Sequence, residues 1–176
     1  MTVKNVDKLL KKISVIESNV PNVHARTAIA VGLAPVKAQA ILLVPNNSGE
    51  LRQSITQAID SFSGGVRGTL YTNKAYASYV EFGTGPKGAE NHKGTSPLVS
   101  PTYTMQPWYI HESQIDSSLA EQYHWPFFDT PNGRFYECTG QPAQPFMYPA
   151  LKNTEKIATK KIRDYLSKKI REDVGK

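Results

Sequence analysis

The chain has little cysteine and lacks the long apolar stretches that mark membrane proteins. Cys138 is the single cysteine among 176 residues, so an internal disulfide is impossible and a cysteine-rich zinc site is excluded. No apolar run approaches the roughly 20 residues that cross a bilayer, and the first residues, MTVKNVDKLLKK, contain no apolar signal core. These absences predict a soluble protein made in the reducing cytoplasm, with no membrane partner.

Motifs of common enzyme classes are also missing. The sequence contains no Gly-x-Ser-x-Gly elbow, no phosphate-binding loop and no dinucleotide glycine fingerprint. Glu81 could bind zinc with His92, His111 and His124, but the spacings of 11, 19 and 13 residues match no helical or knuckle pattern. The sequence therefore predicts no catalytic residue, no metal site and no cofactor.

The charges that are present are mostly positive. There are 21 Lys and Arg against 15 Asp and Glu, a formal charge of +6 that permits attraction to nucleic acid or to an acidic protein surface. Much of the excess lies at the C-terminus, where the spacing predicts a helix over 149–173 with a basic outer face. Its predicted buried stripe consists of Ile157, Ile162, Leu166 and Ile170. A basic face is more often solvated than bound to DNA, so nucleic-acid binding or processing is kept as the alternative function.

Helical spacing of apolar residues runs through 3–42. Pro21 should break this pattern and Pro35 should kink or restart it, because proline lacks an N–H and clashes with the preceding turn. Two or three helical pieces are expected. Asn47 or Ser48 then offers a side-chain oxygen to cap a short helix that follows.

The apolar period changes from helical to two in the next segment. Residues 54–60 and 66–72 are β-type sequences on either side of a Ser-Gly-Gly turn, which predicts a hairpin. The predicted fold is α+β, with the N-terminal helices and the C-terminal helix covering one face of a small antiparallel sheet. We expect a single domain over 1–176 with its sheet core in 44–85, because 39% hydrophobic and 20% charged residues are typical of a globular protein.

The stretch 79–85, YVEFGTG, places one carboxylate between large apolar residues just before a flexible turn. Glu81 could be a general base, a metal ligand or a charge that faces a partner. Residues 76–82 fit one or two helical turns closed by Gly83. A partly buried carboxylate must be paired, and Thr84, the flanking glycine amides or a basic residue of a neighbouring subunit are available partners.

Residues 86–144 differ in composition from the rest of the chain. They hold seven prolines, both tryptophans and three of the four histidines, so regular structure should be scarce in this loop insertion. Short strands are expected within 108–110, 124–128 and 133–138. A segment so aromatic must pack on something, so it either folds back on its own sheet or reaches a partner molecule. We expect the second for at least part of it.

Two further pairs of residues have both a structural and a functional interpretation. Arg52 and Glu50 lie in the cap segment beside the hairpin, where an exposed helix pair is favoured over a functional role. Trp108 and Trp125 could anchor the long loop on the sheet or serve as interface anchors, and the sequence favours neither alternative.

Three segments taken in order resemble a family of tailed-bacteriophage head–tail joining proteins, the minor tail components or tail-completion proteins. They are 44–55 (VPNNSGELRQSI), 76–85 (YASYVEFGTG) and 144–151 (QPFMYPAL), followed by the basic C-terminal helix. The family usually has threonine where this chain has Ser48 and an acid near Asn46 or Asn47, changes that preserve capping. It also joins its second and third segments by a shorter stretch, so the role of the insertion does not transfer.

The resemblance implies a virion structural protein of the neck, without catalysis. Its copies would form a ring, a hexamer by analogy with tail symmetry, whose lumen passes DNA. Expected partners are the connector or stopper protein and the tail tube or tail terminator protein; the expected location is the virion, with the host cytoplasm during assembly. We expect Glu81→Ala to impair assembly more than folding. The predicted interface residues are Glu81, Phe82, Gly83, Thr84, Gly85, Arg52, Trp108 and Trp125.

Overall fold

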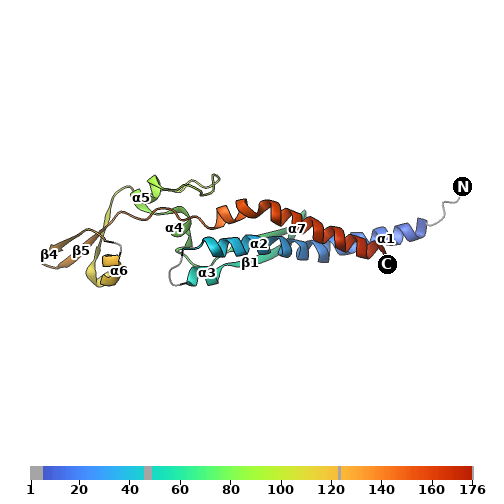
Figure 1. Cartoon of the computed structure of the whole chain (residues 1–176), viewed down its shortest axis with the longest axis horizontal. Coiled ribbons are helices and arrows are strands. Elements are labelled where there is room, and N and C mark those ends of the chain that lie inside the picture. The colour runs from blue at the N-terminus through green and yellow to red at the C-terminus, as the bar shows by residue number, and fades with distance from the viewer. Residues whose placement is uncertain (1–5, 46–48, 123, 176) are drawn as a thin grey trace. The chain divides into compact units, whose positions relative to one another are not determined.

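The computed structural model describes residues 6–45, 49–122 and 124–175. Within it the chain divides into two compact units (Figure 1). Met1–Lys74 with Phe146–Lys176 form the first, which we call the helical unit, and Ala75–Pro145 form the second, the aromatic unit. The predicted α+β class is confirmed, with two small antiparallel sheets, one in each unit.

The helical unit begins with the predicted N-terminal helices. Pro21 lies in a π-helical turn between two α-helices, as its expected break requires, whereas the second helix continues through Pro35 instead of restarting there. The proposed caps Asn47 and Ser48 lie outside the described residues. The elements are α1 (Val6–Asn19), η1 (Val20–His24), α2 (Ala25–Leu43), α3 (Glu50–Ser54), β1 (Thr56–Phe62), β2 (Gly65–Tyr71) and α7 (Met147–Gly175).

The predicted hairpin is confirmed. β1 and β2 pair antiparallel, with Phe62 opposite Gly65 across a two-residue turn. The strands are displaced by only one or two residues from the segments 54–60 and 66–72. Arg26 of α2 donates from its guanidinium to the Ile59 carbonyl and to the Ser61 hydroxyl, both at 2.9 Å, so α2 is tied to β1 as well as packed on it.

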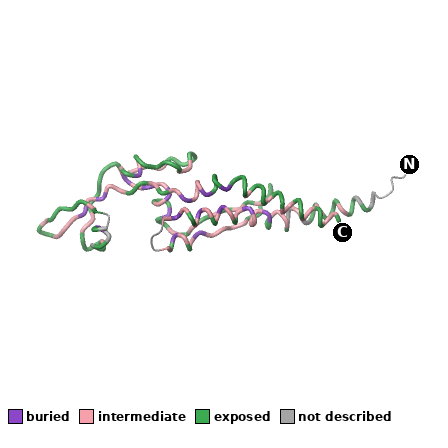
Figure 2. The backbone as a smooth tube through the Cα atoms, viewed as in Figure 1, coloured by how far each residue is buried: buried purple, intermediate pink, exposed green. Residues whose placement is uncertain are grey.

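Helix α2 forms the core of the helical unit because it packs on α7 and on the hairpin. Its buried residues recur at every fourth position: Ala28, Gly32, Val36 and Ala40. A Cβ atom added to Gly32 would lie 2.5 Å from Ile162 Cγ1, so the small residue lets α7 approach closely. Ile29 and Leu33 reach Gly68 of β2 in the same way from the adjacent side of α2. Buried residues follow α2 in Figure 2.

The predicted buried stripe of α7 is partly wrong. Ile157 is 51% exposed, and the buried positions near the start of the helix are Ala150 and Thr154. The Thr154 hydroxyl donates to the Ala150 carbonyl at 2.6 Å, which satisfies it within the helix. Small residues at this end of α7 allow close contact between helices, and farther along the helix the contact with α2 is made by Ile162. The spacing of large apolar residues therefore predicted the wrong residues at the start of the buried face.

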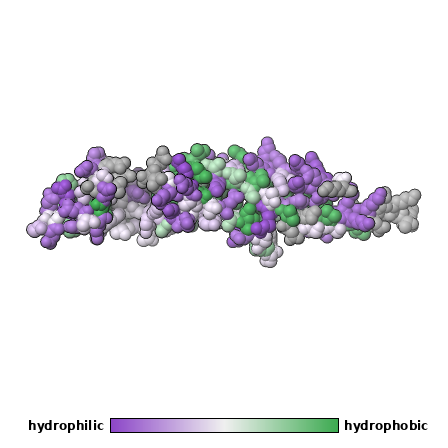
Figure 3. Space-filling model, turned by 90° about the horizontal axis from the view of Figure 1, so that it is seen from below, coloured by the Kyte–Doolittle hydropathy of each residue, from purple (hydrophilic) through white to green (hydrophobic). Residues whose placement is uncertain are grey.

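Helix α2 also contradicts the expectation that no segment is long and apolar enough to cross a membrane. By length and apolar composition alone, its 19 residues are sufficient to span a membrane. The core helix of a soluble protein can be equally long and apolar, and α2 packs against α7, η1, β1 and β2. Hydrophobic residues also reach the surface among hydrophilic ones, as Figure 3 shows for one face, with Leu42 73% exposed.

The aromatic unit contains more regular structure than a long loop. The short strands expected at 108–110, 124–128 and 133–138 form a second antiparallel sheet with the order β3-β5-β4, so the prediction of one sheet was incomplete. Short helices precede and connect these strands. The elements are α4 (Ala77–Phe82), α5 (Gly85–Glu90), β3 (Trp108–His111), η2 (Glu112–Gln114), α6 (Ser117–Gln122), β4 (Phe127–Thr130) and β5 (Gly133–Cys138).

Candidate assembly site

The turn after α4 is a point of close contact between two backbones. Gly83 ends the helix with φ 76°, and Gly85 follows with φ 61°. A Cβ atom on Gly83 would lie 2.7 Å from the Ala143 nitrogen, and one on Gly85 would lie 2.7 Å from the Thr139 carbonyl oxygen. Both glycines are therefore needed for two reasons, positive φ and lack of space.

The segment that the turn approaches is 139–144, just before α7. Thr84 N–H donates to the Gln141 carbonyl at 2.9 Å, and Gln141 N–H donates back to the Thr84 carbonyl at 3.1 Å. Gln144 N–H donates to the Val80 carbonyl at 2.8 Å. Gly140 has φ 84°, and a Cβ atom there would collide with the Thr84 carbonyl oxygen. Sequence reasoning missed this pairing, although Gly140, just after the predicted strand 133–138, was its signal.

A cavity of about 290 Å³ opens beside this turn, within the aromatic unit. The Tyr103 hydroxyl donates to the Phe82 carbonyl at 2.8 Å and holds the extended segment 101–104 along one wall. The lining includes five of the eight predicted interface residues, Phe82, Gly83, Thr84, Gly85 and Trp108, together with Ser78, Tyr79, Pro101, Thr102, Tyr103 and Thr104. Tyr79 is 58% exposed and Trp108 38% exposed, so aromatic surface is available at its mouth.

Glu81 lies on the buried side of α4. Its side chain is only 6% exposed, and it interacts within the chain. A carboxylate at such a position is costly unless it is paired or hydrogen-bonded, as the sequence reasoning required. It is not among the residues that line the cavity, so any effect of Glu81 on a partner bound there would be indirect.

Arg52 belongs to the helical unit. Its Nη2 donates to the Val44 carbonyl at 3.4 Å, and its buried Nε has no hydrogen-bond partner among the described residues. Glu50 does not pair with Arg52, because its carboxylate accepts from Lys74 Nζ at 2.7 Å. This hydrogen bond and the Lys74 charge lower the pKa of Glu50.

Trp125 is half-buried and follows α6, where its backbone N–H donates to the Ala120 carbonyl at 3.1 Å. Its side chain interacts within the chain. Trp125 is absent from the cavity lining that contains Trp108. The two tryptophans, which the sequence could not distinguish, are therefore placed differently: Trp108 at an open cavity and Trp125 at an internal contact.

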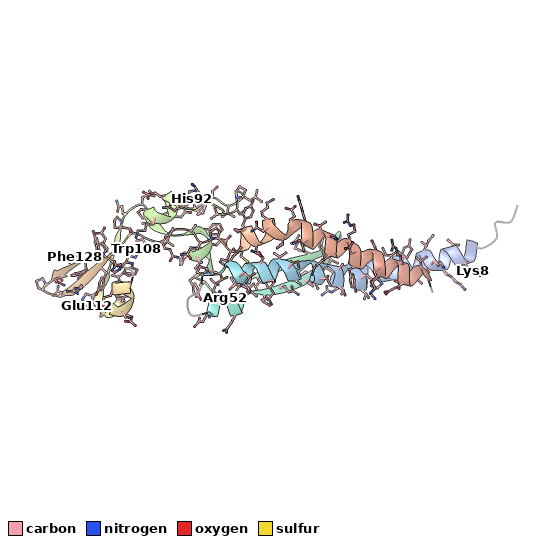
Figure 4. All side chains as sticks on the ribbon, in the orientation of Figure 1. Lys8, Arg52, His92, Trp108, Glu112 and Phe128 are labelled. Carbon is pink, nitrogen blue, oxygen red and sulfur yellow. The ribbon has the colours of Figure 1, made fainter. Side chains whose placement is uncertain are left out.

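The second sheet exposes aromatic side chains that sequence reasoning did not assign to the interface. By strand register one face carries Tyr109, Phe128 and Phe135, with ring centroids 5.4 Å apart for Tyr109–Phe128 and 5.8 Å for Phe128–Phe135. On the other face the Arg134 guanidinium lies 3.9 Å from the Phe127 ring centroid and pairs with Asp129, which raises the pKa of Arg134. Figure 4 shows Trp108 and Phe128 on this unit.

Chemistry-bearing side chains are dispersed in the part of the chain that the structure describes. No three or more His, Cys, Asp and Glu side chains lie together there as a group that could hold a metal ion. His111 Nδ1 hydrogen-bonds Ser113 at 2.8 Å, and its Nε2 lies 2.9 Å from the Asn132 carbonyl, so it holds the adjacent turns. Cys138 is buried in β5, and desolvation raises the pKa of its thiol, which makes it a weak nucleophile.

Comparison with known families supports the motif-based assignment. Residues 7–83 match the family model described as "Bacteriophage HK97-gp10, putative tail-component". The resemblance to a phage tail-component family is thus confirmed over 7–83. The match runs from α1 through the hairpin and α4 and ends at Gly83, so the 139–144 segment and α7 lie beyond it. No match is found among curated proteins or among solved structures.

Proposed function

We propose that the chain is a non-enzymatic structural subunit of a phage neck. In this proposal its copies form a ring at the head–tail interface that joins or completes the tail and passes DNA. The observation that carries the proposal is the tail-component match over 7–83, which ends at the glycine turn beside the cavity. A tail-component family implies a location in the virion, and the subunit would be in the host cytoplasm during assembly.

The proposed partners are further copies of the chain, six by analogy with tail symmetry, the connector or stopper protein and the tail tube or tail terminator protein. DNA would pass through the lumen. Exposed aromatic residues on the aromatic unit support contact with a protein, because such side chains supply much of the energy of protein interfaces. We expect the proposed surface to include Trp108 and the cavity mouth, with Glu81 acting from within the same unit. Arg52 stays a proposed interface residue of the helical unit.

The direct test uses a phage in which the corresponding gene carries a nonsense codon. Without the protein, electron microscopy should show filled heads and separate tails, and expression of the wild-type chain should restore joined particles. Joined, infectious particles in its absence would overturn the proposal. Trp108→Ala should lower the yield of joined particles more than Tyr76→Ala, a matched control because the two side chains are 38% and 39% exposed and Tyr76 does not line the cavity.

A second experiment tests whether the insertion serves as an assembly arm. Hydrogen exchange and proteolysis of 86–144 should be slower in the assembled neck than in the free subunit, because a partner would cover exposed aromatic surface. Equal protection in the two states would mean that this segment is only an intramolecular element.

The alternative function is nucleic-acid binding or processing, and the exposed basic residues of α7 favour it. A nucleic-acid-binding protein should bind duplex DNA with an affinity that falls steeply with salt. Tight binding by the free subunit, together with its absence from purified virions, would favour this alternative over the neck.

A further inference from the structure

Charge is divided unequally between the two units. The helical unit has 18 Lys and Arg against 8 Asp and Glu, a formal charge of +10. The aromatic unit has three against seven, a formal charge of −4. Residues 94–133 contain four acids and no Lys or Arg. The net charge of the chain, +6, conceals two surfaces of opposite sign.

The positive charge is concentrated on the outward face of α7. At about 100° per residue, five basic side chains fall within an arc of about 100° and extend along about 28 Å of the helix. All five residues are exposed. The face lies opposite the line of Ala150, Thr154 and Ile162 that packs toward α2. We call these five residues the basic stripe: Lys152, Lys156, Lys160, Arg163 and Arg171.

The charge of the basic stripe is largely uncompensated. Lys152 lies 3.6 Å from Glu155, but the other four members form no ion pair with any residue that the structure describes. The acids near the end of α7 are engaged elsewhere: Glu172 with Lys168 and Lys169, and Asp173 with His24 at 2.9 Å. Unpaired cations arranged in a row favour an extended partner of opposite sign.

The aromatic unit presents such a surface. Glu112, Asp116 and Glu121 are exposed in the segment of η2 and α6, and none forms an ion pair with a Lys or Arg among the described residues. Glu112 accepts a hydrogen bond from the backbone N–H of Arg134 at 3.1 Å. We call these three residues the acidic edge; Glu112 is labelled in Figure 4. Hydrogen bonds from Ser118 lower the pKa of Asp116, which keeps it ionised at neutral pH. Asp129 differs, because Arg134 neutralises it at 2.8 Å.

We infer that the acidic edge of one copy docks on the basic stripe of another copy. The two surfaces have opposite charge and lie on different units, so contact between copies joins unlike patches. If each copy places its edge on one neighbour and receives the edge of another on its stripe, the contact is head-to-tail and generates a ring when its rotation closes. The inference deepens the proposed function and rests on it only for ring closure; the pairing itself needs no phage component.

Charge reversal tests the pairing. The stripe variant carries Lys156→Glu and Lys160→Glu, and the edge variant carries Glu112→Lys and Glu121→Lys. Asp116 is kept because it accepts two hydrogen bonds from Ser118, whereas Glu112 accepts one, from the Arg134 backbone N–H. The matched control reverses Lys8 and Lys11 of α1, which are exposed, form no ion pair with any described residue and give the same change in net charge. Self-association is measured by sedimentation velocity at low salt and at about 1 M salt, where the screening length falls to about 3 Å.

The wild type should self-associate at low salt and dissociate at high salt. The association constant of each variant alone should be lower than that of the wild type by a factor of about ten or more. An equimolar mixture of the two variants should recover association, because the reversed surfaces are again complementary. The control should behave as wild type. A monomeric wild type at low salt, a mixture without recovery or a control as defective as the stripe variant would each overturn the inference.

Two other partners of the stripe give distinct results. If it binds DNA, the stripe variant should lose duplex binding while self-association is unchanged. If it contacts the acidic edge of the same chain, the variants should alter the sedimentation of a monomer. Either result overturns the inference. Failure of the proposed function is distinguishable from failure of this inference. If copies associate in a charge-dependent way but phage tails join without the protein, the neck role is wrong and the contact between copies still stands.

Discussion

The contacts that hold each unit together internally differ between the helical unit and the aromatic unit. In the helical unit, side chains fill the space between elements, as where Ile162 of α7 covers Gly32 of α2. In the aromatic unit, the central contact is between backbones, with Gly83 and Gly85 against 139–144. Side-chain packing can adjust to a small change, whereas two apposed backbones cannot. The comparison teaches that the aromatic unit should tolerate substitution less well at its glycines.

The units also differ in what covers their apolar residues. Both units leave some large apolar side chains exposed, but in the helical unit the central helix buries Ala28, Val36 and Ala40, whereas the sheet of the aromatic unit leaves Phe127 and Phe128 about half exposed. Apolar surface of this kind on a small sheet marks a place where another molecule can bind. The tail-component match over 7–83 covers the helical unit up to Lys74 and continues through α4 of the aromatic unit.

The largest effect is expected for Gly140→Ala in the aromatic unit. The added Cβ meets the Thr84 carbonyl at positive φ, so the unit should lose about 3 kcal/mol or more of stability. Denaturant unfolding followed by labelling of buried Cys138 measures this unit specifically. Gly94→Ala is the matched control: φ is 83° and the nearest atom to a Cβ is Pro145 Cγ at 3.3 Å, so only about 1 kcal/mol is expected. Equal losses would exclude the backbone collision as the cause.

The same labelling experiment tests the prediction of a single domain. If loss of helical circular dichroism and exposure of Cys138 share one denaturant midpoint, the two units unfold as one cooperative domain. Separate midpoints would show that they unfold independently.

Glu81→Ala should have the next largest effect. Removing a buried, paired carboxylate leaves its partner unsatisfied, so we expect a loss of about 1–3 kcal/mol, and a smaller loss for Glu81→Gln, which keeps the shape. The greater effect on assembly than on folding stays a prediction. It is measured as joined particles per folded subunit; an unchanged ratio would mean that Glu81 serves the fold alone.

Gly32→Ala in the helical unit should cost about 1–2 kcal/mol, less than Gly140→Ala. The reason is that its Cβ meets the flexible end of Ile162, 2.5 Å from Cγ1 and 2.6 Å from Cδ1, and not a backbone atom. Adding Ile162→Val removes Cδ1 and should recover part of the loss in a double-mutant cycle of unfolding free energies. No coupling between the two substitutions would contradict the proposed contact.

The smallest effect is expected at the exposed pair Glu50–Lys74. Lys74 lowers the pKa of Glu50 below its ordinary value of 4.5, so the folded state binds the proton less tightly than the unfolded state. The pair therefore stabilises the fold above that value, and its contribution is lost as pH falls through the lowered pKa. Lys74→Gln should lower the melting temperature slightly near neutral pH, and this difference should disappear at pH values below the lowered pKa of Glu50. A larger difference in acid would contradict this assignment.

The sequence predicted the helical unit well because its signals are local. Apolar periodicity predicted α1 and α2, and alternation predicted the hairpin. A local signal also worked in the aromatic unit, where glycine predicted the end of α4 at Gly83. Phe82, Thr84 and Trp108 were identified as interface candidates, and the structure brings them to one cavity. Their interface role stays a prediction.

What the sequence by itself determined was the set of elements and the glycine turn, since periodicity and backbone freedom are properties of neighbouring residues. Only the tertiary structure decided that Ala150 and Thr154, not Ile157, lie against α2, and that the short strands of the insertion form a second sheet. It also decided that Gly140 meets Thr84, more than 50 residues away in the chain. Such contacts depend on which surfaces fit closely in space, and neither helix crossing nor strand order can be read from local spacing.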